Sequence, residues 1–154
     1  KLFRQCYDNS SPTYYKLSAT NNTQDYDVDF GKNLIIQEKG DIVIIAVGEM
    51  LNTVLEATYD LDVTIIYCTT VKPFDVNSIQ KFLNKKIVIV EPYYSGSVLT
   101  NIIRECNGFS GDVTNIGITN EFINKYGKKC EIDSMIGVDT HSVRKKIMER
   151  INEN

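Results

Sequence analysis

Several motifs and residue types are absent or scarce in this sequence, and each shortage argues against a class of protein. The chain has a single histidine, and its four cysteines form no C-x-x-C pair, so a zinc site is not expected. No run of about 18 apolar residues is present, so we expect no transmembrane helix and no membrane partner. No signal-peptide pattern is found, and the scattered cysteines fit a reducing cytoplasm, which is the expected location.

A strong positive charge is also lacking. The net charge is −3 and the isoelectric point is about 5.2, whereas nucleic-acid binding needs a basic face. The basic clusters are short, have acidic neighbours and are typical of a solvated surface: Lys85–Lys86, Lys128–Lys129 and Arg144–Lys146. We therefore expect no nucleic-acid partner.

The common phosphate-binding and nucleophile motifs are missing as well. The sequence has no G-x-G-x-x-G fingerprint, no P-loop and no G-x-S-x-G elbow. His141, the only histidine, is expected in the first turn of the last helix, where such a residue is usually on the surface, and no orienting partner is evident. No catalytic constellation emerges from the motifs.

The pattern that is present is an alternation of buried strands and amphipathic helices. Four apolar runs of strand length are typical of strands buried on both faces, namely "DIVIIAVG", "DVTIIYC", "KIVIVEP" and "DVTNIGI", and "NLIIQEKG" predicts a shorter strand before them. Most of these runs are followed by a segment whose apolar residues recur at helical spacing. The fold class is therefore α/β, with a mostly parallel sheet between helices on both faces.

Several helix details can be predicted from spacing and capping residues. One helix after Gly48 should carry an apolar face from Met50 to Tyr59, and Asp75 should cap the next. "EIDSMIG" predicts a helix of one or two turns. The last helix should begin near Asp139 or Thr140 and bury one face, formed by Val143, Ile147 and Ile151.

The first 31 residues have a different character. Residues 1–8 are expected to be the tail of a helix, and "TYYKLS" (13–18) has the composition of a strand. From Ala19 to Gly31 the chain is polar and acidic, which predicts a linker or a long surface loop. Because the chain starts at Lys1 instead of a methionine, we expect a fragment of a longer protein.

Two acidic residues follow predicted strands at the edge where α/β proteins place their sites. Glu49 comes directly after one buried strand, and Glu91 ends another. Either can be a site acid. The alternative for Glu49 is a favourable charge in the first helical turn, and Glu91, before Pro92, can accept backbone hydrogen bonds in the turn.

The turn after Glu91 is the remaining candidate. Adjacent Tyr93 and Tyr94 can line a pocket or a protein interface, or one can be packed and the other exposed. The single glycine of Ser95-Gly96-Ser97 can offer N–H groups to an anion, but more often such a residue only turns the chain. We favour a structural turn that contacts a neighbouring domain or subunit.

Several segments, in order, resemble one known family. "GDIVIIAVGEMLNTVLEA", "DVTIIYCTTVKPFD", "KIVIVEPYYSGSVLTNII" and "NIGITNEFINKYGKKCEIDSMIGVDTHSVRKKI" are similar to the C-terminal domain of transketolase-type enzymes, with Thr70, Lys72, Pro73 and Asp75 in a T-x-K-P-x-D pattern and with Glu91 and Gly96 in their expected places. "SPTYYKLS" resembles the last strand of the pyrimidine-binding domain that precedes it. The division implied is residues 1–31 as tail and linker, and residues 32–154 as the C-terminal domain.

The resemblance implies a fold and a parent enzyme. It implies a five-stranded mixed sheet with one antiparallel strand, in the non-catalytic third domain of a thiamine-diphosphate- and Mg²⁺-dependent transferase. The implied role of this domain is domain and subunit packing or regulation. Such an enzyme moves a two-carbon ketol or acyl unit and is expected to be a homodimer. The cofactor-binding motifs belong to the N-terminal domains, so no cofactor or metal ligand is expected here, and those domains are the expected partners.

The sequence departs from the family pattern at three places. Ala19 stands where sugar-phosphate transketolases carry an arginine that contacts the substrate phosphate, and alanine cannot replace a bidentate guanidinium. Thr69 stands where an arginine is common, and the turn around Ser95 is shorter than in relatives. Two alternatives stay open: a free-standing α/β protein-binding module, and the end of a 2-oxo acid dehydrogenase beta subunit.

Overall fold

One mixed sheet of five strands organises the computed structural model, which describes residues 1–8, 10–96, 98–124 and 126–153. β1 pairs antiparallel with β3, and all other neighbours are parallel. The predicted α/β class, with a mostly parallel sheet and one antiparallel strand, is confirmed. In spatial order the strands are β1 (Asn33–Gln37), β3 (Thr64–Cys68), β2 (Ile42–Val47), β4 (Lys86–Tyr94) and β5 (Asp112–Ile118).

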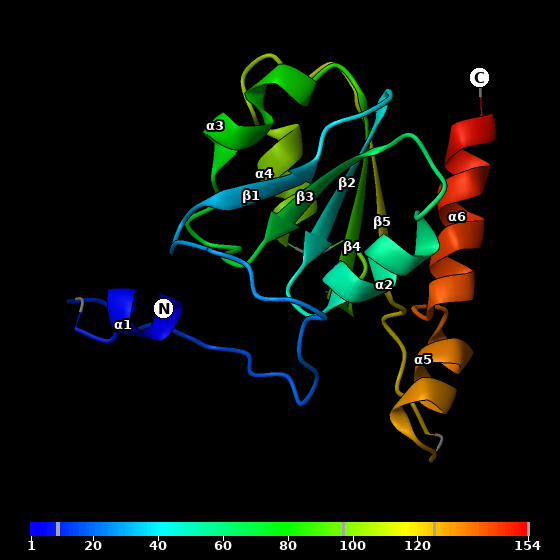
Figure 1. Ribbon diagram of the computed structural model, residues 1–154, viewed down its shortest axis with the longest axis horizontal. Helices are drawn as coiled ribbons and strands as arrows, with labels where there is room; N and C mark the ends of the chain where they lie inside the picture. Colours follow the sequence, from blue (N-terminus) through cyan, green and yellow to red (C-terminus); the bar gives the residue numbers. More distant parts are fainter. Residues whose placement is uncertain (9, 97, 125, 154) are drawn as a thin grey trace.

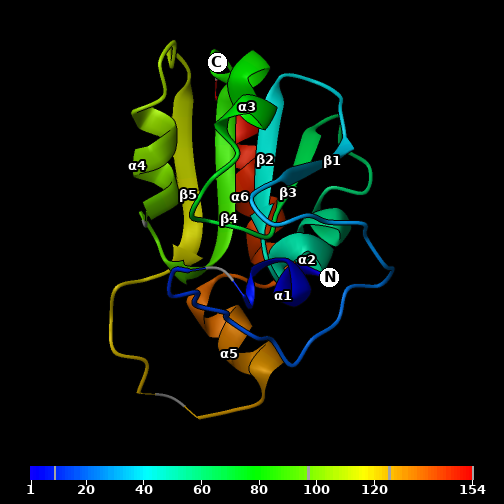
Figure 2. The same ribbon diagram turned by 90° about the vertical axis from the view of Figure 1, so that its left-hand side faces the viewer.

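Helices cover both faces of this sheet, which explains the continuous apolar runs (Figures 1 and 2). Every residue of β2 and β3 is buried, because neither face of these strands reaches water. One face packs against α2 (Met50–Ala57) and α6 (Thr140–Asn152). The other face packs against α3 (Val76–Ile79), the 3₁₀ turn η1 (Gln80–Phe82) and α4 (Val98–Arg104).

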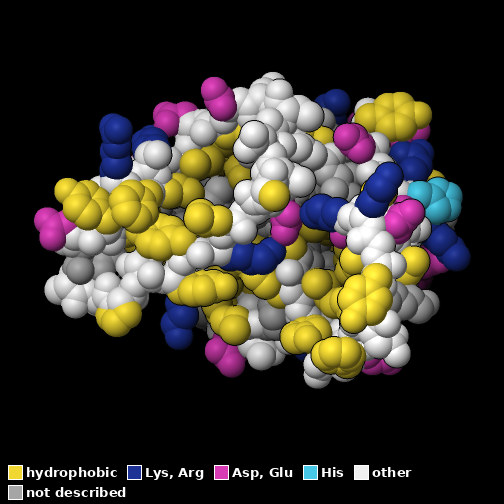
Figure 3. All heavy atoms as spheres, turned by 90° about the horizontal axis from the view of Figure 1, so that it is seen from below, with side chains coloured by type: hydrophobic (Ala, Val, Ile, Leu, Met, Phe, Trp, Pro, Cys, Tyr) yellow, Lys and Arg dark blue, Asp and Glu magenta, His cyan; other side chains and the backbone are white. Residues whose placement is uncertain are grey.

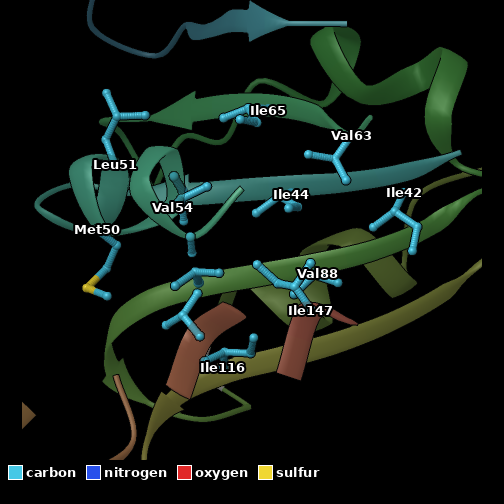
Figure 4. Packing of buried hydrophobic residues seen from close by; sticks show 14 of the residues in the cluster. Ile42, Ile44, Met50, Leu51, Val54, Val63, Ile65, Val88, Ile116 and Ile147 are labelled. Atoms are coloured by element: carbon cyan, nitrogen blue, oxygen red, sulfur yellow. The ribbon is translucent and has the colours of Figure 1, made fainter. Parts of the chain in front are cut away.

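The core on the α2 and α6 side is built from alternate strand residues and one stripe of each helix (Figure 4). Ile44 and Val88 of neighbouring strands point toward Leu51 and Val54 of α2 and Ile147 of α6, all fully buried. Their burial removes apolar surface from water, which is the main driving force for folding.

The two C-terminal helices follow their predicted boundaries. Asp139 caps α6 by accepting hydrogen bonds from the backbone N–H groups of His141 (3.0 Å) and Ser142 (3.3 Å). Val143 and Ile147 are buried beneath α6, and Ile151 packs on the same cluster, as predicted. Helix α5 (Lys129–Ile136) has two turns and lies below the sheet in Figure 1.

Two helix predictions are wrong in detail. Tyr59 lies beyond the last residue of α2 and is exposed, because the helix ends at Ala57. Asp75 occupies the cap position of α3, but its carboxylate accepts from the backbone N–H of Asn33 on β1 (3.3 Å). The side chain of Asp75 therefore ties α3 to the edge strand instead of capping the helix.

The N-terminal segment follows the prediction only in part. A short helix, α1 (Leu2–Cys6), fits the expected helix tail, and residues 19–31 form no helix or strand. The predicted strand at residues 13–18 is wrong, because none of these residues is paired in a sheet. Strand propensity needs a partner strand to take effect, and the domain offers none at this place. Within the described ranges, no helix is long and apolar enough to cross a membrane.

Candidate functional site at the carboxyl edge of the sheet

The strand order reverses between β2 and β4, and this is where open α/β sheets place ligands. From β2 the chain passes through α2 to β3 on one side, and β4 then lies on the other side of β2. Glu49 follows the carboxyl end of β2, and Glu91 lies near the carboxyl end of β4. The two predicted acids therefore lie at one edge of the sheet, beside its topological switch point.

Glu49 holds the N-terminal segment in place. Its carboxylate accepts hydrogen bonds from Lys16 Nζ (2.8 Å) and Ser18 Oγ (2.6 Å), and from Thr20 Oγ1 at 3.4 Å. The Glu49 side chain is only 14% exposed. Burial raises the pKa of this carboxyl, but the hydrogen bonds from Lys16 and Ser18 outweigh burial and leave the pKa lowered. A role as a favourable charge in the first turn of α2 does not account for the three hydrogen bonds that Glu49 accepts.

Glu91 is fully buried and has a different partner. The side-chain Nδ2 of Asn115 on β5 donates to Glu91 Oε1 at 2.5 Å. The same Nδ2 lies 3.4 Å from Thr100 Oγ1 of α4. The Asn115 amide thus connects Glu91 of β4 with Thr100 of α4, and the environment of Glu91 is that of a structural carboxylate.

The two tyrosines after Glu91 have different environments. β4 continues through Pro92, so Tyr93 and Tyr94 both lie in the strand, and its register with β5 shifts between Val90 and Tyr94. Tyr93 packs against the core, and burial raises the pKa of its hydroxyl. The Lys16 ammonium lies 5.1 Å from the centre of the Tyr93 ring. Tyr94 is 56% exposed.

A shallow apolar groove opens beside these tyrosines. Its volume is about 450 Å³, and it is lined by Pro92, Tyr93, Tyr94, Ile118, Glu121, Phe122 and Ile123. The lining is mostly aromatic and aliphatic, which suits a protein side chain better than an anion.

The turn at Ser95 and Gly96 follows Tyr94 and is bonded to β5. Ser95 donates its backbone N–H to the carbonyl of Ile118 (2.9 Å), which ties the turn to β5. Gly96 has φ +79°, a backbone conformation that favours glycine. A Cβ added at this position would have no heavy atom within 4 Å. Ser97 lies outside the described residues.

Sequence reasoning missed the residues that complete the site. Lys16, Ser18 and Thr20 reach Glu49 from about 30 positions away in the chain, and no local pattern signals such a contact. Asn52 and Asn115 belong to no recognised site motif, so no sequence pattern singles them out. His141 is exposed at the start of α6, as expected. Among the described residues, no group of three or more His, Cys, Asp or Glu side chains is arranged to hold a metal ion.

The fold and the order of segments agree with the comparison to known proteins. The family model described as "Transketolase, C-terminal domain" matches residues 31–143. The chain belongs to this family. The resemblance inferred from the sequence motifs is therefore confirmed.

Curated relatives of this transketolase C-terminal family member are much longer proteins. An uncharacterized 33.6 kDa protein in the fasciation locus of Rhodococcoides fascians is 32% identical over 110 residues, which are 68% of this chain and 35% of that protein. The 1-deoxy-D-xylulose-5-phosphate synthase of Chlamydia felis is 31% identical over 137 residues, which are 80% of this chain and 21% of that protein. The chain thus spans about a third or less of these relatives.

Solved structures show the same fold at low sequence identity. A split-gene transketolase, described as an inactive beta4 tetramer, matches with a TM-score of 0.66 and 19% identity, covering 86% of this chain and 46% of that one. The transketolase of Campylobacter jejuni matches with a TM-score of 0.58 and 18% identity, covering 88% of this chain and 21% of that one. The transketolase C-terminal fold is therefore shared over most of the chain.

Proposed function

We propose that this chain is the non-catalytic C-terminal part of a transketolase-like, thiamine-diphosphate-dependent transferase. The parent enzyme moves a two-carbon ketol or acyl unit, acts in the cytoplasm and is a homodimer. In this proposal the chain contributes to domain and subunit packing. The observation that carries it is the apolar character of the carboxyl-edge face.

Large apolar side chains remain uncovered on that face (Figure 3). Phe122 and Tyr126, in the segment between β5 and α5, are 92% and 98% exposed. Leu17 and Tyr94, from the N-terminal segment and β4, are also exposed. Contacts with another protein surface would remove this area from water, and aromatic residues are enriched in such contacts. We therefore assign the face to packing against the preceding domains.

The cofactor belongs to those preceding domains in this proposal. We place Mg²⁺, the partner ion of thiamine diphosphate, in those domains as well, and among the described residues no group of three or more His, Cys, Asp or Glu side chains is arranged to hold a metal ion. We accordingly derive no catalytic step from this chain.

The proposed substrate is limited by two residues of the N-terminal segment. Ala19 cannot supply the guanidinium that the family resemblance leads us to expect at its position. Lys16 is the neighbouring cation, but its ammonium is paired with Glu49 and lies over Tyr93. We therefore propose that the parent recognises its substrate without this phosphate contact.

The test is reconstitution with the polypeptide encoded upstream or in the adjacent gene. We expect the chain alone to bind no thiamine diphosphate in calorimetry, and the assembly to bind it and to form a ketol or acyl product. Phe122→Ser and Tyr126→Ser should each weaken the assembly, whereas Tyr59→Ser should not. Tyr59 is a matched control because it is 81% exposed but lies after the C-terminal end of α2, away from the carboxyl edge.

Two results would overturn the proposal. Turnover by the isolated chain would contradict its non-catalytic role. Failure to associate with any thiamine-diphosphate-binding polypeptide would contradict the parent enzyme and support the free-standing binding module instead. Transfer of the acyl unit to an acyl-carrier partner would instead identify the parent as a 2-oxo acid dehydrogenase.

A further inference from the structure

Residues 16–23, which we call the strap, cross the carboxyl edge of the sheet without forming a helix or a strand (Figures 1 and 2). The strap connects the N-terminal residues to the loop that leads into β1. It lies beside the topological switch point, where related architectures hold a ligand. In this chain, a segment of the protein itself occupies that edge.

Alternate residues of the strap point toward one carboxylate. Lys16, Ser18 and Thr20 all direct a donor to Glu49. Leu17, between two of them, is 88% exposed. The chain bends at Ala19, where the backbone N–H of Thr20 donates to Ser18 Oγ at 3.1 Å, and this turn brings both hydroxyls to Glu49. Glu49 thus contacts one side of the strap and leaves the other side open.

Asn52 holds the strap by its backbone. It lies three residues after Glu49 on α2, so the two side chains lie on the same side of the helix. Asn52 Nδ2 donates to the carbonyl of Asn21 (2.9 Å), and Asn52 Oδ1 accepts from the backbone N–H of Thr23 (3.2 Å). A side-chain amide can satisfy both a donor and an acceptor of a peptide in this way.

Two tyrosines from the sheet complete the contacts. The Tyr93 ring of β4 lies under the Lys16 ammonium at 5.1 Å, and the Tyr67 hydroxyl of β3 accepts from Asn22 Nδ2 at 3.2 Å. Side chains from α2, β3 and β4 therefore converge on eight consecutive residues. The contacts involve a cation, hydroxyls and backbone groups.

We propose that Glu49, Asn52, Tyr67 and Tyr93 form a peptide-binding site whose occupant is the strap of the same chain. The site selects a lysine followed by hydroxyl residues at the second and fourth positions after it. Binding of the strap at this site fixes the position of the preceding part of the protein on this domain. The identity of that preceding part rests on the proposed function, whereas the binding of the strap does not.

The first test measures release of the strap in the whole chain. Trypsin cleaves after Lys16, and the cleavage rate tracks the open fraction when opening is fast. Because hydrogen bonds to a charged group are among the stronger ones, we expect Glu49→Gln to speed cleavage at Lys16 about tenfold, and more with Asn52→Ala added. Glu38→Gln and Asn101→Ala are matched controls: Glu38 pairs with Lys81, and Asn101 is exposed on α4. Circular dichroism and the urea midpoint must show that all variants are folded.

The second test uses two substitutions that add the same charge to the strap. Ser18→Asp places a carboxylate against Glu49, whereas Leu17→Asp places one on the exposed side. Hydrogen exchange at the Thr23 amide should become about tenfold faster in Ser18→Asp and stay unchanged in Leu17→Asp. Equal exchange in both variants, together with unchanged cleavage in Glu49→Gln, would overturn the proposal. Both readouts use this chain alone, so they hold whether or not the reconstituted enzyme is active.

Discussion

The side-chain amide of Asn115 donates a hydrogen bond to the buried carboxylate of Glu91 at 2.5 Å, and this contact links β4 and β5 beside the registered pair Val90 and Ile116. A fully buried carboxylate needs hydrogen-bond donors, because the protein interior solvates charge poorly. The pair therefore explains why a glutamate is tolerated directly after the buried apolar residues of β4.

Asn115→Leu should destabilise the protein, because the leucine removes a donor from the buried Glu91 carboxylate while keeping a similar volume. We expect a loss of about 2–4 kcal/mol in the free energy of unfolding, measured by urea denaturation. Asn101→Leu, on the exposed side of α4, is the control and should change little. Adding Glu91→Gln to Asn115→Leu should recover part of the loss, and a purely additive double variant would contradict the account.

Two glycines with positive φ should respond differently to alanine. Gly40 has φ +59°, and a Cβ there would overlap the backbone carbonyl of Asp62, whereas Gly48 has φ +55° with open space around it. Gly40→Ala combines conformational strain with a backbone clash and should cost about 3–5 kcal/mol, while Gly48→Ala should cost about 1–2 kcal/mol. Urea unfolding of the two variants tests the ranking, and equal losses would show that the Asp62 segment moves aside.

The strands with continuous apolar runs could be predicted from the sequence because burial on both faces leaves a strong local pattern. Ile42–Val47 and Thr64–Cys68 are such strands. The cap of α6 at Asp139 could also be predicted from the sequence, since capping depends on residues only two or three positions away.

The contacts of the strap could not be predicted, because their causes are distant in sequence. Residues 13–18 have strand propensity, but a strand also needs a neighbour with free backbone groups, and the sequence does not say where one lies. Glu49 could be named as a candidate from its place after β2, and that role stays a prediction. Its partners Lys16 and Ser18 became visible only in three dimensions.

The cysteines should react with iodoacetamide in an order set by their burial. Burial raises the pKa of Cys68 to about 12, and also raises the pKa of Cys106, whereas Cys130 is exposed. Because the thiolate is the reactive form, the raised pKa leaves very little of Cys68 ionised at pH 8. Mass spectrometry should find Cys130 labelled first, Cys106 later and Cys68 only after unfolding. Early labelling of Cys68 would contradict its burial.

Acidification should release the strap from Glu49. The pKa of this carboxyl is lowered in the folded protein from the ordinary value of 4.5, so its stabilising contribution is complete above that value and is lost as the pH falls through the folded pKa. The charged and titratable groups around Glu49 are Lys16, Lys129 and Tyr93. The amide signals of Ser18 and Thr20 in NMR spectra should therefore shift with a midpoint below pH 4.5 while circular dichroism still reports a folded domain. Glu49→Gln, which cannot titrate, should abolish this transition, and its persistence in that variant would assign the shift to another group.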